Sequence, residues 1–138
     1  MVIQEELQLS TDGPGHIQDI TDAVRQVISE TEIQCGIVSI FNVGSTAAIG
    51  AIEYEPGLCR DLPELLNRLI PASAEYGHEQ TWHDGNGHSH LQATTLGPEI
   101  TVPIRDAQPV LGTWQQIFHL ECDVRPRSRT LIITVLGE

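Results

Sequence analysis

Apolar and polar residues alternate, or apolar residues form short runs, over much of the chain. These patterns are typical of β-strands that are buried on one or both faces. They predict strands at residues 2–9, 35–43, 49–54, 90–96, 100–104, 113–123 and 130–136. Turn-forming residues such as Gly97 and Pro98 separate several of these segments.

Two segments have the three- and four-residue spacing of amphipathic helices. One covers residues 20–31 and carries Ile20, Val24 and Ile28, and the other covers residues 61–69, beginning at Asp61 and ending before Pro71. There are about seven predicted strands and two helices, and the last four strands are consecutive. We therefore predict an α+β fold: a single compact, β-rich domain of residues 1–138 with a mostly antiparallel sheet.

The composition limits the chemistry. The 138 residues include 19 acidic and 7 basic residues, and every basic residue is arginine. Without lysine, the protein cannot use a lysine Schiff base, covalently attached pyridoxal phosphate or a P-loop. A net charge of −12 argues against binding nucleic acid or an anionic membrane through bulk charge. The expected partner is a small molecule, a metal ion or a second copy of the chain.

The cysteines and the apolar segments suggest the compartment. Cys35, Cys59 and Cys122 are odd in number and widely spaced, which is typical of free thiols in a reducing cytosol. No apolar run approaches the roughly 18 residues that span a bilayer, and the first ten residues carry acidic rather than basic side chains. We expect a soluble, cytoplasmic protein.

Four of the six histidines lie in the segment YGHEQTWHDGNGHSHL. On an extended chain His88 and His90 point to the same side, where His78 could join them from the preceding loop. Three imidazoles favour zinc or another late transition metal and leave one coordination position open. The alternative is a solvent-facing loop whose histidines only form hydrogen bonds.

Asp84 and Asn86 lie between these histidines in a DGNG segment. Its glycines allow backbone amides to face an anion, and Asp84 could orient a histidine or a water molecule. An ordinary tight turn explains the same residues equally well.

Three of the seven arginines lie in the RPRSR segment, at Arg125, Arg127 and Arg129. If this segment is extended, its alternation directs all three guanidinium groups to one face, where they would match phosphate or carboxylate. The alternative is that they pair with neighbouring acids such as Glu121 and Asp123.

Ser45 and Thr46 follow Gly44 between two predicted strands, where hydroxyl groups and an accessible backbone can contact a ligand. Further along, Glu53 alternates in register with the apolar residue Ile49. A half-buried carboxylate requires a histidine, arginine or metal partner. Glu53 is therefore a candidate general acid or base, or one half of a structural ion pair.

These segments together resemble the YjbQ-like family, catalogued as UPF0047. The matching stretches are STAAIGAIEYEPG, YGH, DGNGHSHLQATTLGPEITVPI and LGTWQQIFHLECDVRPRSR, in this order between residues 36 and 137. The resemblance implies a β-rich α+β domain that assembles as a trimer, with a metal ion, often zinc, and anions near the subunit contacts. It also implies a thiamine-phosphate synthase activity, which joins a thiazole phosphate to a pyrimidine pyrophosphate and releases pyrophosphate.

Carried over by position, the residues of the family's motifs fall on His78, His90, Glu53, Arg127 and Arg129. The sequence departs from the family at Gly44, where many members have a histidine. His88 is the candidate to replace that histidine in space.

We therefore expect a metal-dependent enzyme that acts on a small phosphorylated or pyrophosphorylated metabolite. Imidazole ligands favour zinc, whereas a pyrophosphate substrate would favour Mg²⁺. Metal-assisted phosphate hydrolysis and a non-catalytic trimer that binds a metal or an anion are the alternatives. The expected metal ligands are His78, His88 and His90, the expected catalytic residues are Glu53 and Asp84, and the expected substrate-binding residues are Ser45, Thr46, Asn86, Arg127 and Arg129.

Overall fold

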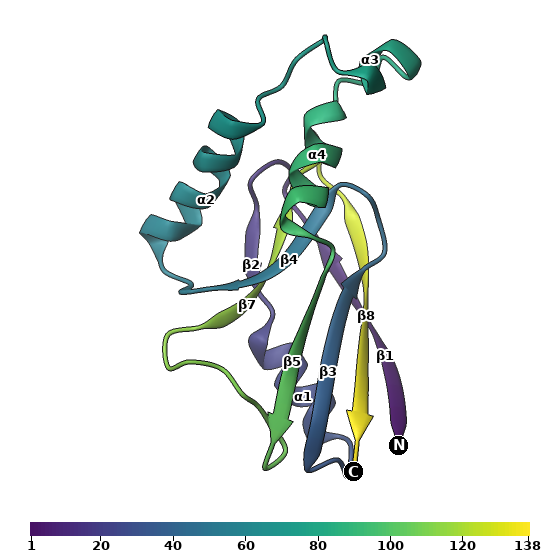
Figure 1. Ribbon diagram of the computed structural model, residues 1–138, viewed down its shortest axis with the longest axis vertical. Coiled ribbons are helices and arrows are strands. Elements are labelled where there is room, and N and C mark those ends of the chain that lie inside the picture. The colour runs from purple at the N-terminus through teal and green to yellow at the C-terminus, as the bar shows by residue number, and fades with distance from the viewer.

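The computed structural model describes residues 1–138 and contains two β-sheets and four helices (Figure 1). The strands are β1 (Val2–Ser10), β2 (Ile17–Asp19), β3 (Cys35–Asn42), β4 (Ala47–Ile52), β5 (Glu99–Arg105), β6 (Gln108–Pro109), β7 (Gln116–Glu121) and β8 (Ser128–Gly137). The helices are α1 (Thr21–Ser29), α2 (Pro56–Leu69), α3 (Gly77–Thr81) and α4 (Gly87–Leu96). The large sheet has the order β1-β8-β3-β5-β6 and the small sheet the order β2-β7-β4, and every pairing is antiparallel. The predicted α+β class is confirmed.

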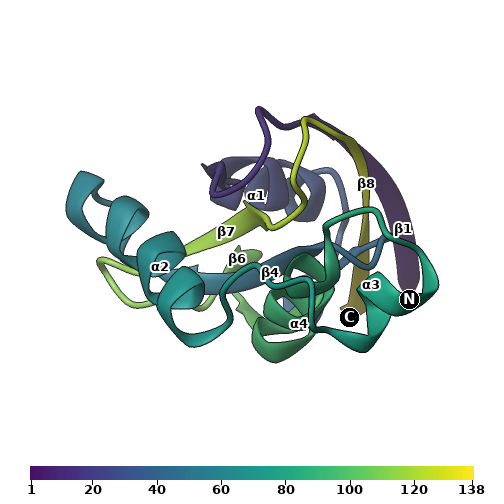
Figure 2. The same cartoon turned by 90° about the horizontal axis from the view of Figure 1, so that it is seen from above.

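The sheets and helices are arranged in layers. In Figure 2 the small sheet lies between α1 and the pair formed by α2 and α4. The main core combines aliphatic side chains of α1, β3, β5 and β8 with Ile49 and Ile117 from the small sheet. A second cluster joins Phe118 and Leu120 of β7 to Leu66 of α2 and Ala93 of α4. Each face of the small sheet is therefore buried, one against the large sheet and α1 and the other against α2 and α4.

Strand β7 alternates between these two layers. Phe118 and Leu120 face the helices, whereas Ile117 faces the large sheet. Because side chains alternate along a strand, His119 and Glu121 share the face of Ile117. Both are fully buried. The space between the two sheets is therefore apolar around Ile117. It is polar around His119 and Glu121, at the end of β7 that lies beside the segment preceding β8.

His119 is neutral in this setting. Its Nε2 lies 3.0 Å from Oδ1 of Asn42, which accepts a hydrogen bond from the ring. Burial is the largest influence and lowers the pKa of His119 to about 4; Glu121 opposes this shift, while Arg129 and His16 add to it. Protonating His119 in the folded state is therefore unfavourable.

We expect the protein to lose stability as the pH falls from about 6.5 to about 4, because His119 takes up a proton more readily after unfolding. The free energy of unfolding should fall by up to about 3 kcal/mol across this window. His119→Gln retains a donor toward Asn42 but does not titrate, so urea denaturation as a function of pH should show a flatter dependence in this variant. If the free energy of unfolding depends on pH identically in the wild-type protein and in His119→Gln, protonation of His119 is not the cause of the loss.

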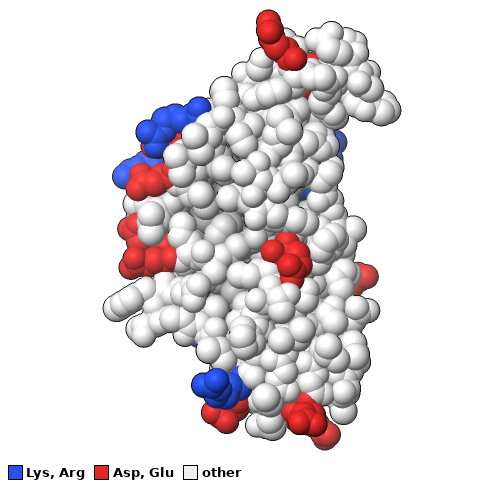
Figure 3. All heavy atoms as spheres, viewed as in Figure 1, with Lys and Arg blue, Asp and Glu red and all other residues white.

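One face of the large sheet carries no helix or second sheet (Figure 1). Three large apolar side chains on it, Ile37, Phe41 and Leu136, are 40–45% exposed. The strand register places Leu136 beside Ile37, in line with Val2 of β1 and Pro103 of β5. Figure 3 shows only a few charged side chains on this side of the molecule. The exposed face is thus partly apolar.

The prediction of a strand at residues 90–96 is wrong, because these residues belong to α4. The β-branched pair Thr94 and Thr95 favours a strand in isolation. The buried positions of α4 include Ser89, Gln92 and Ala93, which have the spacing of a helix face. Two of these three residues are polar, so hydrophobicity alone does not reveal the helix.

The other elements differ less from the prediction. Helix α2 begins at Pro56 rather than near Asp61, because the Glu55 side chain accepts hydrogen bonds from the backbone amides of Gly57 and Leu58. This cap satisfies amides of the first helical turn. Helix α3 and the short strands β2 and β6 were not predicted. No helix of the structure has the length and apolar character that crossing a membrane requires.

Candidate functional site

A buried glutamate shapes the loop between α3 and α4. The Glu79 carboxylate accepts hydrogen bonds of 2.7 Å from the backbone amides of both Gly85 and Gly87. Gly85 has a φ of 75°, a conformation that glycine adopts without strain. The loop therefore turns back on α3 and brings Asp84 and Asn86 against His78.

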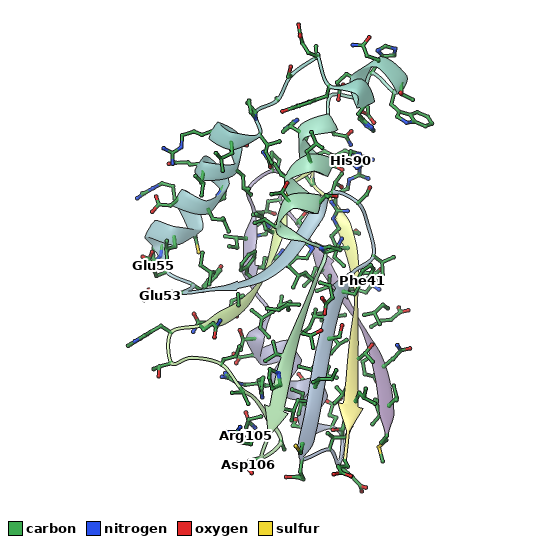
Figure 4. The ribbon with its side chains drawn as sticks, in the orientation of Figure 1. Phe41, Glu53, Glu55, His90, Arg105 and Asp106 are labelled. Atoms are coloured by element: carbon green, nitrogen blue, oxygen red, sulfur yellow. The ribbon has the colours of Figure 1, made fainter.

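These residues form a compact group with His90. His78 Nε2 lies 3.1 Å from Oδ1 of Asp84 and 2.8 Å from the side-chain amide of Asn86. The rings of His78 and His90 are tilted by 51°, with their centroids 4.5 Å apart. We call His78, Asp84, Asn86 and His90 the histidine cluster. It lies at the end of the molecule where α3 and the first turns of α4 meet, and Figure 4 labels His90 there.

His88 does not join this cluster. Because α4 is a helix, residues two positions apart point about 200° away from each other. His88 lines a cavity beside α2, whereas His90 faces His78. The expectation that His88 and His90 share one side depended on an extended chain and is wrong.

The buried Asp123 carboxylate lies next to the histidine cluster. One of its carboxylate oxygens, Oδ2, accepts hydrogen bonds from Arg127 Nε at 2.8 Å and from Thr46 Oγ1 at 3.0 Å, while the other lies 3.4 Å from the Asn86 amide. Burial alone would raise the pKa of Asp123, but hydrogen bonds from the Val124 amide and from these side chains outweigh it and lower the pKa. Asp123 is therefore a buried carboxylate held by Arg127 and Thr46 beside Asn86.

The arginines of the RPRSR segment are largely neutralised. Arg129 is buried and donates from Nε to Glu121 at 2.8 Å, while its Nη2 contacts both Glu121 and Thr46. Arg127 pairs with Asp123, with both Nε and Nη2 directed at Oδ2 of the carboxylate. Of the two interpretations of this segment, pairing with Glu121 and Asp123 is the one that the structure confirms.

The remaining predicted residues are dispersed. Thr46 is buried within the ion-pair network, whereas Ser45 is exposed in a shallow hollow that it shares with Gly44, Ala47 and Thr94. Glu53 is exposed, and Figure 4 places it near the beginning of α2, away from His90. The expectation that Glu53 is a half-buried partner of a histidine or arginine is therefore wrong.

Comparison with known proteins identifies relatives along nearly the whole chain. The sequence profile of the family described as UPF0047 protein YjbQ-like matches residues 5–138. The chain belongs to the YjbQ-like family. A UPF0047 protein of Methanothermobacter thermautotrophicus is 39% identical over 137 residues, which cover 99% of this chain and 94% of the relative. The predicted family membership is confirmed.

Solved structures of YjbQ-like relatives have the same fold. A YbjQ-like protein of unknown function from Sulfolobus solfataricus superimposes with a TM-score of 0.93 at 37% identity, covering 100% of this chain and 99% of that one. A hypothetical protein from Aeropyrum pernix gives a TM-score of 0.90 at 28% identity, with 99% of both chains covered. The architecture described above is therefore that of the YjbQ-like family.

Gly44, which stands where the family resemblance leads us to expect a histidine, lies against the ion-pair network. A Cβ atom at this position would lie 2.9 Å from Nη1 of Arg129 and 3.3 Å from Nδ2 of Asn42. Glycine therefore allows the Arg129 guanidinium to pack against the backbone. His88 lines a different cavity from the hollow beside Gly44, so it does not replace the family histidine in space.

The donor set of the cluster suits a transition metal. His78 and Asp84 place a ring nitrogen and a carboxylate oxygen 3.1 Å apart, and His90 adds a second imidazole beside them. Both oxygens of the neighbouring Glu79 are occupied by backbone amides, so Glu79 is the less available carboxylate. Two imidazoles and one carboxylate are a ligand set that zinc uses in catalytic sites. His78, Glu79 and Asp84 are the groups whose ligand atoms all lie within 4.8 Å of one another, and the ring of His90 packs against His78 beside them. These residue types suit a zinc ion, and Asp84 rather than His88 lies next to His78.

The sequence indicates Glu121 and Asp123 as partners of the arginines, but it does not indicate the supporting role of Glu79. The alternation in FHLECD contains the signal, because it places His119, Glu121 and Asp123 on one side of a segment whose other side is apolar. Buried carboxylates require cations, and the RPRSR segment follows directly. Glu79 has no such signal, since its role depends on the fold of the DGNG loop.

Proposed function

We propose that this protein is a metal-dependent enzyme that acts on a small phosphorylated or pyrophosphorylated metabolite at the histidine cluster. The observation that supports the proposal most directly is the convergence of His78, Asp84 and His90 from two helices and a loop. Such a group, with a second layer of buried hydrogen bonds beneath it, is typical of a site that must hold its ligands in fixed orientations.

His78, Asp84 and His90 would hold the metal, with zinc favoured by the two imidazoles and Mg²⁺ the alternative for a pyrophosphate substrate. A bound divalent ion supplies Lewis-acid polarisation of a phosphate oxygen or of a water molecule. Asn86 contributes by holding His78 and Asp84, because its side-chain amide lies 2.8 Å from Nε2 of His78 and within hydrogen-bond distance of the Asp84 carboxylate.

The chain also offers groups that can bind the phosphate. A guanidinium group has five N–H donors, and Arg127 uses only some of them on Asp123. Its side chain is 31% exposed, so the remaining donors are accessible to an anion. Ser45 offers an exposed hydroxyl near Thr94, which lies one turn of α4 beyond His90. These residues would bind the anionic part of the substrate.

Two reactions belong to this class. One is the synthase reaction that the family resemblance implies, with release of pyrophosphate, and the other is metal-assisted hydrolysis of a phosphate ester. A third possibility is a protein that binds metal and anion without turnover. The position of Glu53 favours this third function, because it removes the expected general acid or base from the cluster.

We also propose that the protein is a cytoplasmic homotrimer. The three cysteines are unpaired, which agrees with a reducing compartment. The exposed apolar residues Ile37, Phe41 and Leu136 on the large sheet provide a surface suited to a subunit contact. Sedimentation equilibrium measures the mass of the assembly in solution. We expect the mass of a trimer for the wild-type protein and the mass of a monomer for Phe41→Glu.

Turnover provides the test of the enzyme proposal. Purified protein is incubated with a thiazole phosphate and a pyrimidine pyrophosphate, or with simple phosphate esters, in the presence of Zn²⁺, Mn²⁺ or Mg²⁺. We expect release of pyrophosphate or phosphate that requires the metal and is lost in Asp84→Asn. His83→Asn, which changes an exposed histidine of the same segment, should retain activity. Absence of turnover by folded, metal-loaded protein would contradict the enzyme proposal and favour the binding protein.

A further inference from the structure

We propose that the cavity between α2, α4 and the end of β7 is a second ligand site, which binds an uncharged planar ring carrying a hydrogen-bond donor next to an acceptor. The cavity has a volume of about 240 Å³. Its apolar walls include Pro63, Leu66 and Leu120, and its polar residues include Asn67, His88 and Gln92. His88 thus acquires a role that the histidine cluster does not give it.

The volume limits the size of the ligand. An engineered cavity of about 150 Å³ in a protein core holds one benzene molecule. The present cavity is larger, at about 240 Å³, so it accommodates a single ring with a small substituent. A nucleotide or a second ring system would extend into solvent. The walls formed by Leu66 and Leu120 match the apolar faces of such a ring.

Polar groups without protein partners indicate the hydrogen bonds. Nδ1 of His88 has no partner and essentially no accessible surface, so His88 contributes a wall of the cavity rather than a hydrogen bond. The Gln92 amide nitrogen donates to Oδ1 of Asn67 at 3.0 Å and to the Ile70 carbonyl at 2.9 Å. The carbonyl of Gln92 and the amide nitrogen of Asn67 remain without protein partners. The Gln92 carbonyl can therefore accept a hydrogen bond from a ligand, and the Asn67 amide nitrogen can donate one. A carboxamide group on the ligand would match both.

The charges around the cavity favour a neutral ligand. No arginine lines it, and the carboxylate of Glu121 is neutralised by Arg129. Burial, as the largest influence, raises the pKa of the Cys122 thiol to about 12, so this wall also carries no charge at neutral pH. A charged ligand would have no oppositely charged partner in this cavity, so its burial would be unfavourable.

The site is separate from the histidine cluster. His88 and His90 lie on different sides of α4, and the residues that line the cavity do not include His78, Asp84 or His90. The inference therefore does not depend on a metal ion or on the proposed reaction.

Benzamide is a suitable probe, with benzoate as its charged counterpart. In a protein-observed NMR titration, we expect saturable benzamide binding that shifts signals of Asn67 and Gln92, and binding of benzoate at least tenfold weaker. Asn67→Trp places a bulky side chain at an exposed position of the cavity wall and should abolish binding. Arg68→Trp, the next residue of α2, lies outside this cavity and should leave benzamide binding unchanged.

The histidines distinguish the two sites. His88→Ala should weaken benzamide binding about tenfold, as expected for the loss of a cavity wall, and should leave zinc binding intact. His90→Ala should have the opposite pattern. The inference is overturned if wild-type protein shows no saturable benzamide binding, or if folded Asn67→Trp binds benzamide as wild type does. A crystal structure with benzamide in which the cavity holds only ordered water would also overturn it.

Discussion

Arg129→Ala should lower the free energy of unfolding by about 3–5 kcal/mol, because it leaves the Glu121 carboxylate buried without its cation. The Glu121 side chain is 0% exposed and that of Arg129 is 7% exposed. Arg129 Nε donates to Glu121 at 2.8 Å, and Thr11 donates to the same oxygen. The two hydrogen bonds that Glu121 keeps in this variant, from the Thr11 hydroxyl and the Asp123 amide, cannot replace the charge in a site that water does not reach. Guanidinium denaturation at neutral pH measures the change.

A matched surface variant and a double variant complete this experiment. Arg25→Ala removes an arginine whose partner, Asp22, is fully solvent-exposed, and it should change stability by less than about 1 kcal/mol. Replacing Arg129 by Met and Glu121 by Leu together should recover much of the loss, since neither charge then remains buried. A loss in Arg129→Ala as small as that in Arg25→Ala would contradict the assigned role of the pair.

His90→Ala should reduce zinc affinity by about 100-fold or more. Altering a group that merely orients a metal ligand costs about 10–100-fold, and His90 is proposed as a ligand itself. Its ring lies against that of His78, with centroids 4.5 Å apart, so its loss leaves His78 and Asp84 as the remaining pair. Competition with a chromogenic chelator at constant pH measures the affinity.

His88→Ala is the control, because it removes a histidine of the same helix that lines another cavity. It should bind zinc as wild type does. If His88→Ala loses zinc and His90→Ala retains it, the arrangement of the cluster is wrong. Circular dichroism of both variants should show unchanged secondary structure, because neither residue belongs to the apolar core.

Much of the sheet could be predicted from the sequence. The strands around residues 100–104 and 130–136 alternate regularly, and one face of each is buried in the main core. Helix α4 could not be predicted in the same way, because Ser89 and Gln92 occupy its buried face. Periodicity identifies an element only when its buried positions are apolar.

The candidate site was predicted in part for the same reason. Clustering along the chain identified His78 and His90, which the fold brings together. It also suggested His88, because the direction of a side chain depends on whether the segment is a strand or a helix. The arginines remain ambiguous, since the sequence does not show whether Arg129 meets a ligand or an acid of the other sheet. The packing of the large sheet against the small sheet decides this in favour of Glu121.

The most direct test of the proposed metal site is anomalous diffraction at the zinc edge from crystals of the full chain equilibrated with zinc. We expect one strong peak within bonding distance of His78, Asp84 and His90, and its loss in crystals of His90→Ala. A peak at His88, or no ordered zinc near His78, would contradict the proposed centre.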